Sequence, residues 1–211
     1  MKKLAYIFAA FLLITSCGDK KQNSQLSENG EGEQKSDERF LPEASGEAGE
    51  IVIVMNKQKY DGPLGDAIKD VFREPVPGLT REEPMFTIRV VEPFEFNRIF
   101  KIARNLVYIV SLEGNSGADK WLEGTFSQSS KDIIMNDPDR FMQTSKNQYA
   151  KNQHILQLFG KDDATLIKNI RENSEVIQNY FNKAEKERLA ANLRMSVASR
   201  GIVNRVIDQL G

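Results

Sequence analysis

Residues 50–72 read EIVIVMNKQKYDGPLGDAIKDVF, and they combine two patterns that decide the fold. Residues 50–55 form a continuous run rich in β-branched side chains, which is typical of a central strand covered on both faces. Asp61, Gly62 and Pro63 then supply the start of a helix. The apolar residues after this start recur at helical spacing: Leu64, Ala67, Ile68, Val71 and Phe72. The stretch therefore predicts a buried strand followed by an amphipathic helix.

Strand and helix patterns continue to alternate along the chain. Strands are expected at residues 86–91, 106–112, 141–144 and 154–159, with helices at 95–104 and in the later half of 121–135. A long helical stretch starts at a cap formed by Asp162 or Asp163, and its residues 183–188 form a charged run expected to be exposed. This alternation indicates βαβ units. The expected fold is α/β, a mixed sheet of four to five strands with packed helices and a long C-terminal helix.

The composition limits the classes of function. The chain has 211 residues, with 29 Lys and Arg against 30 Asp and Glu, and a formal net charge of -1. This length suffices for one domain with a core, or for two small ones. The near-zero charge argues against a nucleic-acid partner bound through a basic surface. The single cysteine, Cys17, and the single histidine, His154, exclude an internal disulfide and most metal sites, so we expect no cofactor.

Residues 1–16 are expected to be a signal peptide. Lys2 and Lys3 provide a positive start, and residues 4–14 form an apolar run of the length found in secretory signals. Such a run is too short to cross a bilayer as a helix, and no later stretch approaches about 18 continuous apolar residues. The mature chain is therefore expected to be anchored to a membrane without spanning it.

The end of this segment carries the most specific motif in the chain. Thr15 and Ser16 directly precede Cys17, and this arrangement resembles the lipobox of bacterial lipoproteins. The resemblance implies transfer of a diacylglyceryl group to the sulfur of Cys17, cleavage between Ser16 and Cys17, and acylation of the new amino terminus by a chain such as palmitate. The thiolate of cysteine is the nucleophile that such a lipidation requires. The alternative is an ordinary cleaved signal with a cysteine near the cut by chance.

Residues 17–48 are expected to be the lipidated cysteine and a disordered polar tether, followed by a single α/β domain at 49–211. The tether is rich in polar residues and cannot bury enough apolar surface to offset its chain entropy. Surface-displayed lipoproteins of the Bacteroidota resemble one another in an acidic cluster directly after the anchor, whereas here Asp19 is followed by Lys20 and Lys21. We therefore favour the outer membrane facing the periplasm, with the cell surface as the alternative.

Few residues are candidates for a site, and none is assigned a catalytic role. Asp61 and Asp66 follow the first strand, where α/β folds usually bind ligands, although acidic residues also stabilise a helix start. Arg98, Lys101 and Arg104 recur at helical spacing and could bind an anion, although a solvated helix face is the simpler interpretation. His154 would need carboxylates from elsewhere to hold a metal. A strand histidine hydrogen-bonded to backbone or water is the simpler interpretation.

Several short motifs together resemble a known family. They are EIVIVM at 50–55, DGPLGD at 61–66, PVPGL at 75–79, EPMF at 83–86 and YAKNQ at 149–153. The string resembles the domain of unknown function 4837 family, lipoproteins of the Bacteroidota with a lipobox and a polar tether. That family has no assigned activity, so no functional residue carries over. Its members usually continue past the long helix into a second, strand-rich portion, which implies that this chain is a truncated or short member.

Two functional hypotheses follow from the sequence. The first is a non-enzymatic, membrane-anchored envelope protein that binds another envelope protein. The second is a hydrolase or small-ligand-binding protein that uses the carboxylates of Asp61 and Asp66 with Arg98 or Arg104. The two differ in one structural requirement, because the second needs these four side chains in a single cleft.

Overall fold

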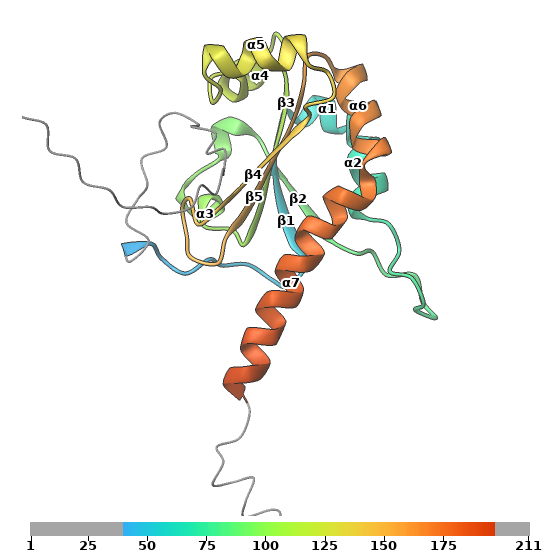
Figure 1. Cartoon of the computed structure of the whole chain (residues 1–211), viewed down its shortest axis with the longest axis vertical. Coiled ribbons are helices and arrows are strands. Elements are labelled where there is room, and N and C mark those ends of the chain that lie inside the picture. Colours follow the sequence, from blue (N-terminus) through green and yellow to red (C-terminus); the bar gives the residue numbers. More distant parts are fainter. Residues whose placement is uncertain (1–39, 197–211) are drawn as a thin grey trace, which may run out of the picture. The chain divides into compact units, whose positions relative to one another are not determined.

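Strands β1 and β3 lie inside a five-stranded sheet with the order β2-β1-β3-β5-β4 (Figure 1). The structure is a computed structural model that describes residues 40–196. Its strands are β1 (Glu50–Val54), β2 (Thr87–Val91), β3 (Asn105–Ser111), β4 (Met142–Lys146) and β5 (His154–Gly160). Strand β1 pairs in parallel with β2 and β3, β3 pairs in parallel with β5, and β4 runs antiparallel to β5. The predicted mixed α/β sheet is confirmed.

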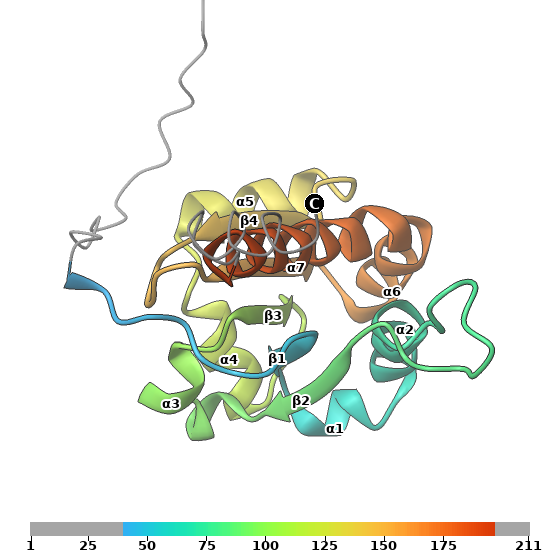
Figure 2. The same cartoon turned by 90° about the horizontal axis from the view of Figure 1, so that it is seen from below.

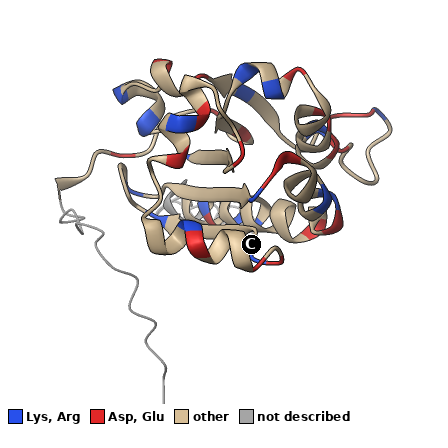
Figure 3. Cartoon of the chain, turned by 90° about the horizontal axis from the view of Figure 1, so that it is seen from above, with Lys and Arg blue, Asp and Glu red and all other residues tan. Residues whose placement is uncertain are grey.

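Helices cover both faces of this sheet. They are α1 (Lys57–Tyr60), α2 (Pro63–Phe72), α3 (Arg98–Lys101), α4 (Gly117–Glu123), α5 (Gln128–Asn136), α6 (Asp163–Glu172) and α7 (Ser174–Ser196), with a 3-10 turn η2 at Pro93–Glu95. Figures 1 and 2 show α2, α6 and α7 on one side of the strands, with α3 and α4 on the other. In Figure 3, Lys and Arg are interspersed with Asp and Glu along these helices.

The alternation of side chains along each strand divides the core into two clusters. In β1, Ile51 and Ile53 face α2, α6 and α7, whereas Val52 and Val54 face the opposite layer. All four are buried, as the continuous β-branched run predicts. On the first face, three aromatic rings meet edge to face with centroids 6.0–6.3 Å apart: Phe72, Phe86 and Phe181. These contacts bring α2, β2 and α7 into one core.

The long C-terminal helical stretch is divided into α6 and α7 by Asn173. The side-chain amide of Asn173 donates to the carbonyl of Asn169 at 2.9 Å. The backbone carbonyl of Asn173 accepts the first hydrogen bond of α7, from the N–H of Ile177. Asparagine favours such local bonds over helix continuation. The break lets α6 and α7 lie on the sheet as separate elements.

Residues 42–45, which the sequence places in the tether, are hydrogen-bonded to the folded part. Ala44 donates its backbone N–H to the carbonyl of Lys151, and Ser45 exchanges backbone bonds with Ile102 and Arg104. The folded part therefore begins several residues before Gly49. The predicted signal peptide, Cys17 and the tether up to residue 39 lie outside the described residues.

Gly65 in α2 provides a test of this packing. A Cβ atom at Gly65 would lie 1.7 Å from the carbonyl oxygen of Tyr60, whereas one at Gly62 meets its nearest neighbour at 3.7 Å. Gly65→Ala is expected to lower the free energy of unfolding by about 3 kcal/mol, because the obstructing atom belongs to the backbone. Urea denaturation measures the loss, with Gly62→Ala as the matched control. Equal effects of the two changes would contradict this packing.

Candidate functional site

The carboxyl ends of the parallel strands, where α/β folds usually bind ligands, are closed by internal hydrogen bonds. Asn56 follows β1, and its side-chain amide donates to Ser116 Oγ at 2.9 Å and to the carboxylate of Asp119. Asp119 is buried and also accepts from the backbone and hydroxyl of Ser116. Lys59 bridges to Asp163 at 2.6 Å. These polar groups therefore hold three loops together.

The structure does not bring the four predicted ligand-binding residues into one cleft. Asp61 is exposed after α1, and Asp66 is exposed and paired with Lys69 at 3.1 Å. Arg98 is exposed at the first position of α3. Arg104 directly precedes β3 and therefore lies at the amino ends of the strands. Because β1 and β3 are parallel, the residues after β1 lie at the opposite end of the sheet from Arg104.

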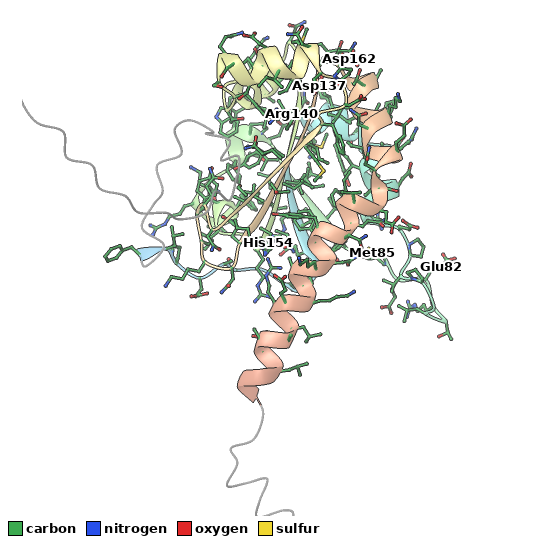
Figure 4. The ribbon with its side chains drawn as sticks, viewed as in Figure 1. Glu82, Met85, Asp137, Arg140, His154 and Asp162 are labelled. Carbon is green, nitrogen blue, oxygen red and sulfur yellow. The ribbon has the colours of Figure 1, made fainter. Side chains whose placement is uncertain are left out.

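A pocket of about 390 Å³ lies at the amino ends of β3 and β5, beside α7. We call it the α7 pocket. The polar side chains in its wall come from the 42–45 segment, the strand ends and α7: Glu43, Arg104, Asn152, His154, Glu187, Arg188 and Asn192. In Figure 4, His154 lies beside the α7 ribbon, at the end of the sheet away from Asp162. Arg104 is thus the one predicted ligand-binding residue that lines this pocket.

Arg188 holds α7 against the strands. Its guanidinium donates to Asn105 Oδ1 at 3.0 Å and to Glu185 Oε1 at 2.7 Å. It also donates to the backbone carbonyls of Arg104 and Asn152, each at 3.0 Å through Nη2, and again to Asn152 through Nε. A guanidinium has five N–H donors, so all of them are used. Burial lowers the pKa of Arg188, while the neighbouring Glu185 opposes that shift.

Two other charged side chains in the wall are left free. Within the described part of the chain, the side chains of Arg104 and Glu187 make no hydrogen bond or ion pair. Arg104 is half-buried, and Glu187 is exposed. The α7 pocket therefore contains one unpaired guanidinium and one unpaired carboxylate.

The side chain of His154 makes no hydrogen bond to the described residues. It is 8% exposed, and its Nδ1 is buried without a partner. Its ring packs edge to face on Tyr180 of α7, with centroids 5.6 Å apart. Burial first, then the nearby charges of Arg188 and Lys146, lower the pKa of His154 to about 4, although Glu187 and Glu185 oppose this shift. The imidazole is therefore neutral at pH 7.

The second nitrogen of His154 remains accessible to the pocket. Among the described side chains, the fully buried nitrogen and oxygen atoms without a partner are Ser111 Oγ and His154 Nδ1. Nε2 makes no hydrogen bond in the described part of the chain, yet it is not one of these atoms. Nε2 therefore retains accessible surface, and His154 lines the α7 pocket. A neutral imidazole protonated on Nε2 offers one donor to the pocket.

A larger depression of about 660 Å³ lies between α2 and α6 and has a different character. Two of its charged side chains, Asp70 and Arg171, are exposed and paired with each other at 3.3 Å. Its Glu74 accepts a hydrogen bond from Gln178. The side chain of Arg73 in its wall makes no hydrogen bond or ion pair with the described residues, but it is exposed. Because Arg104 in the α7 pocket is unpaired and half-buried, we take the α7 pocket as the candidate site.

Arg188 and Glu185 fall within the charged run at 183–188, which the sequence predicts to be exposed. Both are largely shielded, with side-chain exposures of 12% and 20%. The helical spacing of the buried residues Ile177, Phe181 and Ala184 would have placed Arg188 on the same face, four residues after Ala184. The helical spacing therefore indicated that Arg188 is buried, whereas its charge led to the opposite prediction.

Two further properties concern residues 40–196 only. This part of the chain has no group of three or more His, Cys, Asp or Glu placed to hold a metal ion. None of its helices combines the length and the apolar character that a membrane crossing requires.

Arg188→Met tests the attachment of α7. The change leaves the largely buried Glu185 without its cation, and we expect the free energy of unfolding to fall by about 3 kcal/mol. The added change Glu185→Gln should restore part of this loss, because it removes the uncompensated charge. Urea denaturation measures both. Arg171→Met is the matched control, because it breaks the exposed ion pair between Arg171 of α6 and Asp70 of α2, which is worth about 0.5 kcal/mol or less. Equal losses for Arg188→Met and Arg171→Met would refute the attachment.

Comparison with known proteins replaces the family suggested by the sequence. The model of a domain of unknown function, DUF8532, matches residues 44–194. No curated protein and no solved structure matches the chain. The resemblance to the domain of unknown function 4837 family is therefore wrong. Motifs such as EIVIVM and DGPLGD describe a buried strand and a proline-started helix, which unrelated α/β chains can share. The chain belongs to the DUF8532 family.

Proposed function

We propose that this protein is a lipid-anchored binding module of the cell envelope, and that it binds another envelope component in the α7 pocket. The anchor is Cys17, carrying acyl chains such as palmitate. The location is the outer membrane facing the periplasm, with the cell surface as the alternative. The observation that carries the binding role is the unpaired guanidinium of Arg104 in the wall of this pocket.

The unpaired polar groups in the wall of the α7 pocket support a binding role. Buried and half-buried polar groups in folded proteins are normally hydrogen-bonded, because an unmade bond is costly. In the α7 pocket, Arg104 and His154 retain unused hydrogen-bonding capacity beside a cavity of about 390 Å³. Cavities of this size are typical of ligand sites. A bound ligand would supply the partners that the chain itself does not.

The same groups favour binding over catalysis. With a pKa of about 4, His154 is a weak base at neutral pH, whereas an effective general base titrates near the working pH. The hydrolase hypothesis requires Asp61 and Asp66 beside Arg98 or Arg104. Asp61 and Arg104 lie at opposite ends of parallel strands. We therefore do not propose the hydrolase.

The anchor is supported by the sequence alone. A single acyl chain holds a protein to a bilayer only weakly, whereas two or more hold it firmly, because each buried methylene contributes about 0.8 kcal/mol. The lipobox resemblance at Cys17 implies more than one chain. The polar residues between Cys17 and Pro42 would then link the lipid to the folded part.

Cys17→Ala tests the anchor. The variant should move from the membrane fraction to the soluble fraction and lose the lipid-linked mass, because no thiol is left to accept the diacylglyceryl group. Fractionation and mass spectrometry of the full chain measure these changes. Ser24→Ala in the same polar stretch is the control and should stay with the membrane. A wild-type chain without lipid-linked mass, together with unchanged fractionation of Cys17→Ala, would refute the anchor.

Cross-linking and capture from envelope extract test the binding role. The full-length wild type should retain a defined envelope component, and Arg104→Met should lose it, because the free guanidinium is removed while the stem remains. Arg98→Met is the matched control, since it removes the same charge from an exposed site on α3. Recovery of no component by the wild type, or equal recovery by Arg104→Met, would refute binding in the α7 pocket.

A further inference from the structure

We infer that the α7 pocket receives a zwitterionic group, with a carboxylate at Arg104 and an ammonium at Glu187. The inference rests on the proposed function and specifies the chemistry of the bound component. It is carried by three features of the wall: the unpaired charges of opposite sign, the balance of charge around the cavity, and the small side chains of α7 that line it.

Arg104 forms the carboxylate end. The guanidinium of Arg104 lines the pocket and has no partner in the described part of the chain. A guanidinium binds a carboxylate through two parallel hydrogen bonds. Arg188 adds positive charge at this end but no free N–H, because its donors are used by Glu185, Asn105 and backbone carbonyls.

The charge balance of the wall selects against a dianion. Arg104 and Arg188 are matched by Glu43 and Glu187, so the formal charge of the wall is zero. Phosphate, at nearly two negative charges, would leave that excess uncompensated beside the two carboxylates. A zwitterion leaves the balance at zero and places a cation where a carboxylate lacks one.

Glu187 is the better receptor for the ammonium. Glu43 already accepts a hydrogen bond from the side-chain amide of Asn152 at 3.2 Å, whereas Glu187 has no such bond in the described residues. Glu187 precedes Arg188 on α7, and Arg104 approaches from the strand ends. The two free charges therefore come from different elements of the wall, so one ligand could contact α7 and the start of β3 together.

The pocket wall also includes small apolar side chains. Ala184 and Ala191 lie one above the other on α7, seven residues apart, and both line the pocket with Ala44. These methyl groups leave room for a short aliphatic or peptide segment. Cavities of 300–1,000 Å³ hold drug-sized ligands, and the pocket of about 390 Å³ is at the lower end. Its size fits one or two amino-acid residues.

Calorimetric titration of the full chain in detergent tests the inference with four probes. They are glycylglycine, acetate, ethylammonium and inorganic phosphate, each at matched ionic strength. Glycylglycine should bind at least about tenfold more tightly than acetate or ethylammonium, because only it engages both free charges. Phosphate should bind more weakly than glycylglycine.

Variants identify the two ends of the ligand. Arg104→Met should weaken glycylglycine and acetate by about ten- to a hundredfold, the loss expected for a charge-assisted hydrogen-bonded pair. Glu187→Gln should weaken glycylglycine and ethylammonium but leave acetate unchanged. The exposed residues Arg98 and Glu175 supply matched controls, and Arg98→Met and Glu175→Gln should bind as the wild type does. Circular dichroism verifies that each variant is folded.

The outcomes separate this inference from the proposed function. Phosphate binding more tightly than glycylglycine, and lost in Arg104→Met, overturns the zwitterion while leaving the pocket a binding site. Equal affinity for glycylglycine and acetate also overturns it, because Glu187 then contributes nothing. If no probe binds, the zwitterion is overturned. The proposed function is then decided by the capture experiment, which compares the wild type with Arg104→Met.

Discussion

The hydrogen bonds of Arg188 are the constraint on which the candidate site depends. They join α7 to the residues that precede β3 and β5, and Glu185 supplies the matching charge. Ile177, Phe181 and Ala184 extend this attachment as a buried stripe along the same helix. Because α7 is held at this place, its next residues stand over the strand ends and form one wall of the α7 pocket. Without this attachment, Glu187 and Arg104 would not share a cavity.

The two ends of the sheet use their polar groups differently. At the carboxyl ends, Asn56, Ser116 and Asp162 cap helices, and Lys59 is paired with Asp163. At the amino ends, Arg104 and His154 retain unused hydrogen-bonding capacity. Ligand sites of α/β proteins usually lie at the carboxyl ends of the strands. In this chain Arg104 and His154 lie at the amino ends, so the candidate site is at the opposite edge from the one that the fold class alone predicts.

The sequence predicted the elements whose signals are local. The strand at β1 and the helix at α2 follow from residue type and spacing within 23 residues, and the structure places them accordingly. The break at Asn173 was not predicted, because the helical pattern continues on both sides of it. The α7 pocket was not predicted either, because its wall combines residues that lie far apart in the sequence, such as Glu43, Arg104, His154 and Arg188. Arg104 was identified by its charge, although its proposed carboxylate partners lie at the other end of the sheet.

The segment at residues 42–45 also has a mechanical meaning. Its backbone bonds to Lys151, Ile102 and Arg104 lie side by side at the point where the chain enters the fold. Tension applied from the N-terminal side would load these bonds one after another, as when a strip is peeled, before it reaches any strand of the sheet. Pro42, whose carbonyl accepts from Lys151, would detach first, followed by Glu43 and Ala44, which belong to the wall of the α7 pocket. A pull on the chain would therefore open that pocket while the core remained intact.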